Sequence, residues 1–391
     1  MSRSARSSRP VPPGRGARAS RVLLLVLLAL APLASVVRAQ TTLSAIEADV
    51  DRIARRARPS IVTVVAQRTP PARAGAARRP LSRVGSGVAV SARGVVTTAS
   101  VVLGAERVFV MTDNHLEVEA RVVGLDPVRN LALLEPQGME LPSLALATRP
   151  GASGDWVIAL GSSYRSAPTQ SVGTVAMRFT EPGTSLLQLT NEVYPGNSGG
   201  AALNSRGELL GLVQGELGAP SAPGRRERAE RRPGGMSFAI PVEDVVPFLD
   251  GVARHGRVRH GMLGVSTRSV FVDGSGGPGD RVPIGALVEG VAPNGPAARS
   301  GLRKGDLIVA FGSEKVEYSE QLARWVAVAG PGAEVRLVWV RDELASEARV
   351  RLDEAPSAIP SWMRVEPAAT SGGGGATPAS PSEPRAARAP R

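Results

Sequence analysis

A series of short, β-rich runs separated by turn residues constrains the fold of this chain more than any other feature. The runs recur between residues 61 and 241, and Gly, Pro, Asn and Asp lie between many of them. Only 3% of the residues are aromatic, whereas 44 glycines and 32 prolines favour turns and short strands over a helical bundle. We therefore predict an all-β dominated fold, built as a barrel or a sandwich. The expected strands are Ile61–Ala66, Gly87–Ser91, Val95–Thr98, Val108–Thr112, Leu116–Val123, Leu131–Leu134, Trp156–Leu160, Gly173–Arg178, Leu186–Thr190, Ala201–Leu203, Glu208–Val213 and Ser237–Pro241.

The length of 391 residues exceeds what one core usually organises, so two domains are expected. Ser44–Glu47 has the form of a capping box and predicts the start of an amphipathic helix, which Pro59 stops. A second helix over Val242–Arg254 closes the β-rich domain. The predicted organisation is a signal over 1–39, a β-rich domain over 40–255, a smaller domain over 256–355 and a disordered, low-complexity tail over 356–391.

The N-terminal segment has the pattern of a secretory signal peptide. Arginines extend to Arg21, an apolar run covers Val22–Val37, and a small-residue cleavage pattern ends at Ala39. The alternative is an uncleaved membrane anchor, although Pro32 lies in the run and its length matches only the shortest spans. No other stretch is apolar enough to cross a bilayer. The mature protein is therefore expected to be exported, periplasmic or extracellular, without an integral membrane span.

Charge and cysteine content exclude several function classes. The formal net charge is +12, but seven arginines and no acid lie in residues 1–39, so removal of that segment lowers the charge to +5. The other arginines gather around Arg73–Arg83 and Arg225–Arg232 without aromatic residues for base stacking, which indicates solvated loops and no nucleic-acid partner. The chain has no cysteine, which excludes disulfides, thiolate zinc sites and cysteine nucleophiles. No metal or organic cofactor is indicated.

The glycine-rich turn Pro195–Gly200 is the most informative motif. It would hold the Ser198 hydroxyl forward while backbone N–H groups point at one spot, which is how an oxyanion hole is built. The turn lies between β-rich runs, so a chance occurrence is disfavoured. This segment resembles the nucleophile region of the HtrA (Deg) family of trypsin-like serine proteases. Further segments that resemble family motifs are Gly85–Val102, Val123–Leu134 and Gly235–Pro241.

The resemblance implies a chymotrypsin-like pair of β-barrels, with a catalytic histidine and aspartate in the first barrel and the serine in the second. Ser198 matches the serine position. The family histidine position is Ser100 and the aspartate position is Asn130, so two of the three catalytic side chains are absent. A serine hydroxyl is a weak nucleophile until a base takes its proton, and Ser100 cannot act as that base.

No other residue is placed by the sequence to replace the base. The histidines are His115, in an expected hairpin turn, and His255 and His260, at the junction with the second domain; both lysines lie in that domain. We interpret Ser100, Asn130 and Ser198 as a polar cluster whose hydrogen bonds are satisfied. The resemblance carries Gly196 and Ser198 over as the N–H donors of the oxyanion hole, which could still bind a carbonyl or a carboxylate.

The C-terminal domain contains a short glycine-containing stretch, His260–Val265, and two further segments, Gly285–Val288 and Pro296–Ile308. The first resembles the carboxylate-binding loop of PDZ domains and the other two resemble their core signature. The resemblance implies that Gln321–Val328 is a helix beside a peptide groove. Glycine in the carboxylate-binding loop lets backbone N–H groups approach a peptide terminus, and a strand edge accepts the peptide by β-augmentation. The residues of the predicted loop are Met262, Leu263, Gly264 and Val265. The alternatives are a PDZ domain that serves only as a spacer or oligomer contact, and Met262 and Leu263 as core residues.

These patterns predict a proteolytically inactive HtrA-like protein that binds exposed or C-terminal peptide segments. It would act in envelope protein quality control or regulation. The competing hypothesis is an active periplasmic serine endopeptidase that degrades misfolded proteins, with its base supplied in a way that the sequence does not show. The resemblance also implies a homo-oligomer, commonly a trimer in this family.

Overall fold

A computed structural model describes residues 43–69, 81–162, 168–181, 184–216, 237–274 and 281–356. The expected signal peptide, the loop around Arg225–Arg232 and the tail after residue 356 lie outside the described residues. The first element is a helix over residues 43–57, followed by the 3-10 turn η1 (Arg58–Ser60) that contains Pro59. Because this helix already includes residue 43, the prediction that it begins at a capping box on Ser44 is wrong.

The first barrel is a closed sheet of six antiparallel strands. Its strand order is β1-β2-β3-β6-β5-β4, so the hairpin β2-β3 and the hairpin β5-β6 lie side by side through β3 and β6. Mostly Val and Ala side chains fill the interior. The strands are β1 (Ile61–Arg68), β2 (Leu81–Ser91), β3 (Gly94–Thr98), β4 (Arg107–Met111), β5 (Glu117–Asp126) and β6 (Leu131–Pro136).

The second barrel is closed in the same way, in the order β10-β11-β12-β9-β8-β7. Two six-stranded barrels confirm the predicted double β-barrel. Most strands are longer than expected by a few residues, because strand pairing continues past the apolar positions that mark each strand in the sequence. The strands are β7 (Trp156–Ser162), β8 (Pro168–Glu181), β9 (Thr184–Leu189), β10 (Ala201–Leu203), β11 (Leu209–Glu216) and β12 (Ser237–Pro241).

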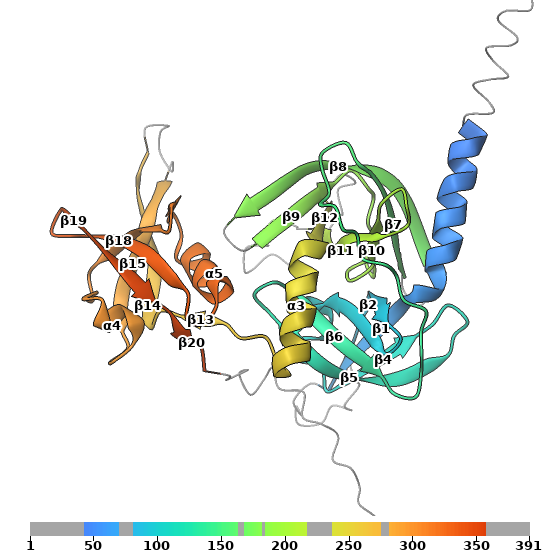
Figure 1. Ribbon diagram of the computed structural model, residues 1–391, viewed down its shortest axis with the longest axis horizontal. Coiled ribbons are helices and arrows are strands. Elements are labelled where there is room, and N and C mark those ends of the chain that lie inside the picture. The colour runs from blue at the N-terminus through green and yellow to red at the C-terminus, as the bar shows by residue number, and fades with distance from the viewer. Residues whose placement is uncertain are drawn as a thin grey trace, which may run out of the picture.

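Helix α3 (Val242–His255) crosses both barrels, as Figure 1 shows in yellow. Its Phe248 is fully buried in a core that residues of both barrels share. Close approach of the helix depends on Gly124 in β5, where a Cβ atom would lie 2.5 Å from a methyl group of Val252. The short helix α2 (Ala99–Val102) follows β3 and carries Ser100.

The C-terminal domain, orange in Figure 1, is a separate sheet with two helices. Its main sheet has the order β14-β15-β16-β18-β19, and β13 pairs with β20 beside it. Trp325 and Trp339 are buried in its core. No helix of the described residues is long and apolar enough to span a membrane. The elements are β13 (Gly261–Met262), β14 (Val265–Asp273), β15 (Arg281–Val291), α4 (Pro296–Arg299), β16 (Leu307–Phe311), β17 (Glu314–Lys315), α5 (Ser319–Ala329), β18 (Glu334–Arg341), β19 (Leu344–Arg351) and β20 (Asp353–Glu354).

Candidate active site and peptide-binding groove

The turn that carries Ser198 lies between β9 and β10, and its backbone requires glycine. Gly196 and Gly199 have φ angles of 102° and 87°, a region that L-residues other than glycine rarely adopt. At Gly199 there is also no space for a side chain, because a Cβ atom would lie 2.1 Å from the carbonyl oxygen of Ser86. The second barrel is thus pressed against β2 of the first barrel at this point.

Ser86, fully buried in β2, fixes the turn from the opposite barrel. Its N–H donates to the carbonyl oxygen of Ser198 at 2.8 Å, and its hydroxyl donates to the carbonyl oxygen of Gly196 at 2.6 Å. The same hydroxyl oxygen accepts the N–H of Ser162 at 2.7 Å. Sequence reasoning missed this residue, although the Gly85–Gly87 pattern around it marked a close approach of the backbone. Ser86 therefore positions the turn without taking part in chemistry.

The N–H groups of Gly196 and Ser198 are the two donors that the resemblance assigns to an oxyanion hole. Within the described chain, neither N–H is hydrogen-bonded to a protein acceptor, whereas those of Asn197, Gly199 and Gly200 in the same turn all are. Two unpaired donors separated by one residue are available to an anionic or carbonyl oxygen. The arrangement supports a binding cradle at this turn.

Among the residues that the structure describes, the hydroxyl of Ser198 has no basic partner. Its Oγ donates to the carbonyl oxygen of Gln214 on β11, at 3.2 Å. A backbone carbonyl cannot take the proton from this hydroxyl, because protonation of an amide oxygen is far too unfavourable near neutral pH. Gln214 was not identified from the sequence, and its side-chain Oε1 is buried without a hydrogen-bond partner among the described residues.

Ser100 and Asn130 are brought together, as the resemblance implies for their positions. Asn130 Oδ1 accepts the N–H of Ser100 at 2.8 Å, and the carbonyl oxygen of Asn130 accepts the N–H of Ala99 at 3.0 Å. Asn130 thereby satisfies two backbone donors at the start of α2. The Ser100 hydroxyl contacts Thr98 Oγ1 at 3.3 Å. Ser198 is hydrogen-bonded to neither Ser100 nor Asn130, so the three residues do not form the single polar cluster that we predicted.

None of the three histidines is hydrogen-bonded to Ser198. His115 is exposed in the turn between β4 and β5, and His255 is the last residue of α3. His260, just before β13, places its Nε2 3.4 Å from Oδ1 of the buried Asp126. That carboxylate also accepts the N–H groups of Val128 and Arg129, so it holds the turn that leads to Asn130.

Tyr194 is a titratable residue that directly precedes the nucleophile turn. Its hydroxyl donates to Glu192 Oε2 at 2.7 Å, and this hydrogen bond to a carboxylate raises the pKa of Tyr194 above its ordinary value. A phenol with a raised pKa stays protonated near neutral pH and cannot serve as a base. Within the described ranges, no three His, Asp or Glu side chains gather in a way that could hold a metal ion.

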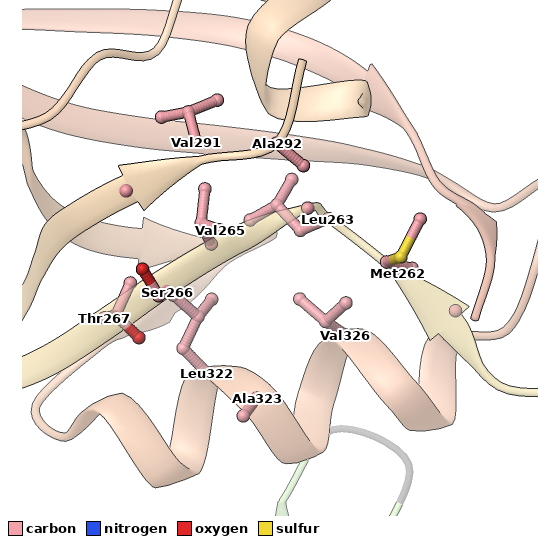
Figure 2. A pocket seen from close by; sticks show the side chains of 13 residues that line it. Met262, Leu263, Val265, Ser266, Thr267, Val291, Ala292, Leu322, Ala323 and Val326 are labelled. Carbon is pink, nitrogen blue, oxygen red and sulfur yellow. The ribbon is translucent and has the colours of Figure 1, made fainter. Parts of the chain in front are cut away.

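A groove of about 570 Å³ lies in the C-terminal domain between β14 and α5. All four residues of the predicted carboxylate-binding loop line it, and Leu263 also belongs to the domain core. Figure 2 shows Leu322 and Val326 pointing from α5 toward Leu263 and Val265, so the floor of the groove is apolar. Among the described residues, the N–H groups of Leu263 and Gly264 have no hydrogen-bond acceptor. The groove thus combines free donors at one end with an apolar floor.

A buried ion pair supports this domain. Asp306, almost fully buried, accepts two hydrogen bonds from Arg341, at 2.6 and 2.7 Å, and the N–H of Arg303 at 2.7 Å. Burial favours the neutral form of the acid, but the hydrogen bonds from Arg341 and Arg303 outweigh it and lower the pKa of Asp306. The carboxylate is therefore held in its charged form.

Comparison with known proteins agrees with this geometry. The sequence family of trypsin-like peptidase domains matches residues 85–212, and the family of PDZ domains matches residues 287–341. Proteins named "probable periplasmic serine endoprotease DegP-like" from Ectopseudomonas mendocina and Pseudomonas fulva are 31% and 30% identical over 295 and 292 residues, which cover 73% and 72% of this chain. The solved structure of the HtrA-type protease AlgW with a tripeptide is 25% identical, with a TM-score of 0.56 over 78% of this chain and 97% of that one.

The chain belongs to the HtrA/Deg family. A serine endoprotease from Yersinia pestis has the same fold, at 26% identity and a TM-score of 0.55 over 78% of this chain and 98% of that one. This HtrA/Deg member spans 60% and 58% of the length of the two curated relatives. The comparisons confirm the trypsin-like double barrel and the PDZ domain that the resemblance implied.

Proposed function

We propose that this HtrA/Deg member is a peptide-binding protein without proteolytic activity. One observation carries the proposal: the Ser198 hydroxyl donates to the carbonyl oxygen of Gln214, and no basic side chain of the described residues is hydrogen-bonded to it. The position of the family base holds Ser100, whose N–H is bound by Asn130 at the position of the family acid. Neither side chain can accept a proton from Ser198 near neutral pH.

The expected loss is large. In trypsin, replacement of the triad aspartate by asparagine lowers turnover about 10⁴-fold, and loss of the histidine in subtilisin costs on the order of 10⁶. The effects of triad members on turnover are not additive, so the expected loss of turnover is set by the missing histidine alone. Residual hydrolysis supported by the N–H groups of Gly196 and Ser198 would be far below that of an active protease.

Binding does not require the missing side chains. The PDZ groove offers the free N–H groups of Leu263 and Gly264 to a terminal carboxylate and an apolar floor to the last side chain of a peptide. The unpaired N–H groups of Gly196 and Ser198 offer a second cradle for a carbonyl or carboxylate. The proposed ligands are exposed or C-terminal segments of unfolded proteins.

The proposed setting is the cell envelope. The curated relatives are named as periplasmic proteins, and residues 1–39 have the pattern of a signal peptide. There the protein would act as a holdase, a sensor or a regulatory partner in protein quality control, and we propose a homo-oligomer on the basis of the family resemblance.

A second candidate is an active serine endopeptidase. The names of the relatives and the unpaired N–H groups at Gly196 and Ser198 favour it. It requires a base that reaches Ser198, which the described residues do not supply.

The two candidates are separated by treating the mature chain with a fluorophosphonate probe and with casein, beside a Ser198→Ala variant. We expect no probe labelling and no casein cleavage above the level of Ser198→Ala. In parallel, a peptide that ends in a free carboxylate should bind at least tenfold more tightly than its C-terminal amide. Casein cleavage that disappears in Ser198→Ala would establish the protease instead, and equal binding of acid and amide would remove the proposed role of the PDZ loop.

A further inference from the structure

The free edge of β14, which borders the peptide groove, continues beyond the pocket between β14 and α5. Strand β14 runs from Val265 to Asp273 and pairs with β15 along its whole length, but its described partners include no strand on the other edge. Each of the two register shifts in this pairing adds one residue to β15, so β14 itself continues without interruption. An edge of nine residues is longer than the pocket, whose lining stops at Thr267.

Two aromatic side chains extend the groove beyond Thr267. Phe271, near the end of β14, makes an edge-to-face contact with Tyr318, the residue that precedes α5, at a centroid distance of 6.2 Å. The guanidinium of Arg281 lies over the Phe271 ring at 5.2 Å. Phe271 and Tyr318 remain 37% and 41% exposed. We call Phe271, Tyr318 and Arg281 the aromatic shelf.

The aromatic shelf faces the same side of β14 as the groove. Ser269, two residues before Phe271, accepts the N–H of Ser319 at 2.9 Å and contacts Glu320, so this face of the strand is turned toward the start of α5. Alternate residues of a strand share a face, which places Phe271 beyond Ser269 along the same line. A ligand strand that extends past the start of α5 therefore meets the aromatic shelf.

The length of β14 determines which residue of a bound peptide reaches the aromatic shelf. A peptide with its carboxylate at Leu263 and Gly264 runs antiparallel to β14, and Phe271 lies seven residues beyond Gly264, about 23 Å at the rise of an extended strand. A peptide of four residues covers only about 13 Å and cannot reach it. The residue opposite Phe271 is about six positions before the peptide's last residue.

We propose that the aromatic shelf is a second specificity subsite of the PDZ groove, which binds an aromatic side chain about six residues before the C-terminus of the ligand. This inference rests on the proposed peptide binding by the groove. Half-exposed aromatic rings in an edge-to-face pair offer both apolar area and a defined geometry to a third ring, and Arg281 adds a cation above the Phe271 ring. The ligand class is thus narrowed to C-terminal segments with an apolar last residue and an upstream aromatic residue.

The test uses isothermal titration of the mature chain with three N-acetylated probes. The first is a tetrapeptide, Gly-Ser-Ala-Val. The second is a series of ten-residue peptides with the same four last residues. The six preceding residues are Gly and Ser except for one Trp, and each peptide places this Trp at a different position, from four to eight before the last residue. The third is the matching series in which Ala replaces the Trp at each position. We expect one Trp position to bind about five- to tenfold more tightly than its Ala counterpart.

Phe271→Ala should abolish the preference for Trp over Ala and leave the affinity of the tetrapeptide unchanged. Leu344→Ala is the matched control, because Leu344 is a large exposed apolar residue of the same domain, at the β18-β19 turn. A Trp preference that survives in Phe271→Ala, or the absence of a preference at every position, would overturn the subsite. Failure of the tetrapeptide itself to bind would instead overturn the proposed function of the groove. Trp325 and Trp339, buried in the domain, report by their fluorescence that each variant is folded.

Discussion

The site around Ser198 and the PDZ groove of this chain differ in what they retain of their families' patterns. At the Ser198 site, Ser86 holds the turn and two N–H groups are unpaired, but the positions of the family histidine and aspartate hold Ser100 and Asn130. In the groove, the free N–H groups of the loop and the apolar floor are both present. Catalysis by a serine depends on a base of the right pKa, whereas recognition of a peptide terminus depends on backbone donors and shape.

The difference teaches that the framework of a protease site and its chemistry are separable. Asn130 accepts the N–H of Ser100, and its carbonyl accepts the N–H of Ala99, so α2 is still anchored to the turn after β5. What the amide lacks is a negative charge with which to orient and stabilise a charged imidazole. The fold therefore does not require this charge, whereas we expect efficient hydrolysis to require it.

The largest expected effect comes from restoring the base. Ser100→His combined with Asn130→Asp should raise casein cleavage by about 10² or more over the starting protein, because the turn and its donors are in place. Ser100 is exposed, which leaves room for an imidazole, and Asp tolerates the left-handed backbone of this position. The control adds Ser198→Ala, which should remove the gain. A folded but inert double variant would show that the site around Ser198 differs from an active one beyond these two positions, for example at Gln214.

The second effect concerns the tight packing of the nucleophile turn. Gly199→Ala should lower the free energy of unfolding by about 3 kcal/mol or more, since a methyl group would overlap the Ser86 carbonyl in addition to the strain of a positive φ. Gly138→Ala is matched for backbone, with φ of 69° and open space around it, and should cost only about 1 kcal/mol. Urea unfolding followed by circular dichroism measures both. An equal decrease in the free energy of unfolding for the two variants would mean that the turn is not packed tightly against β2.

The third effect concerns the buried ion pair of Asp306 and Arg341, which stabilises the domain that contains the groove. Asp306→Asn should destabilise the PDZ domain by about 2 kcal/mol at neutral pH, because the buried acceptor of Arg341 and Arg303 loses its charge. The pKa of Asp306 is lowered in the folded state, so its contribution is full above the unfolded-chain pKa of about 4 and is lost as the pH falls below that value.

Fluorescence of Trp325 and Trp339 during urea unfolding, recorded from pH 7 to about pH 3, measures this dependence. The variant should be less stable at pH 7 and should lose less stability on acidification than the starting protein. A variant with an unchanged acid dependence would assign that dependence to other carboxylates.

The smallest effect concerns the carboxylate-binding loop. Gly264→Ala meets only ordinary contacts, 3.4 Å from the Ala292 methyl, but its φ of 77° is strained for alanine by about 1 kcal/mol. Relief of that strain moves the loop N–H groups, so the affinity for a carboxylate-ended peptide should fall about fivefold. Gly312→Ala, at φ of 65° with open space around it, should leave the affinity unchanged. Unchanged affinity in both would place the carboxylate elsewhere.

Local patterns in the sequence predicted the strands and the two glycine-rich loops, because turn residues and apolar runs act over a few positions. The same reasoning failed at Ser44, since a capping-box pattern also occurs inside a helix that begins earlier. It also missed Ser86, whose hydroxyl meets Gly196 across 110 residues. The partner of Ser198 is likewise a backbone carbonyl of Gln214, and a carbonyl has no signature in a sequence.

The backbone at Asn130 restricts how a protease of this fold can become inactive and remain folded. Its φ of 57° lies in the left-handed region, where Asn, Asp and Gly are accommodated far better than other residues. Gly would remove the acceptor of the Ser100 N–H, and any larger residue would be strained. Asparagine keeps both the left-handed backbone and the acceptor. If the chain is a binding protein as proposed, the replacement of one side-chain oxygen of an aspartate by nitrogen removes the charge at this position and leaves the local structure in place.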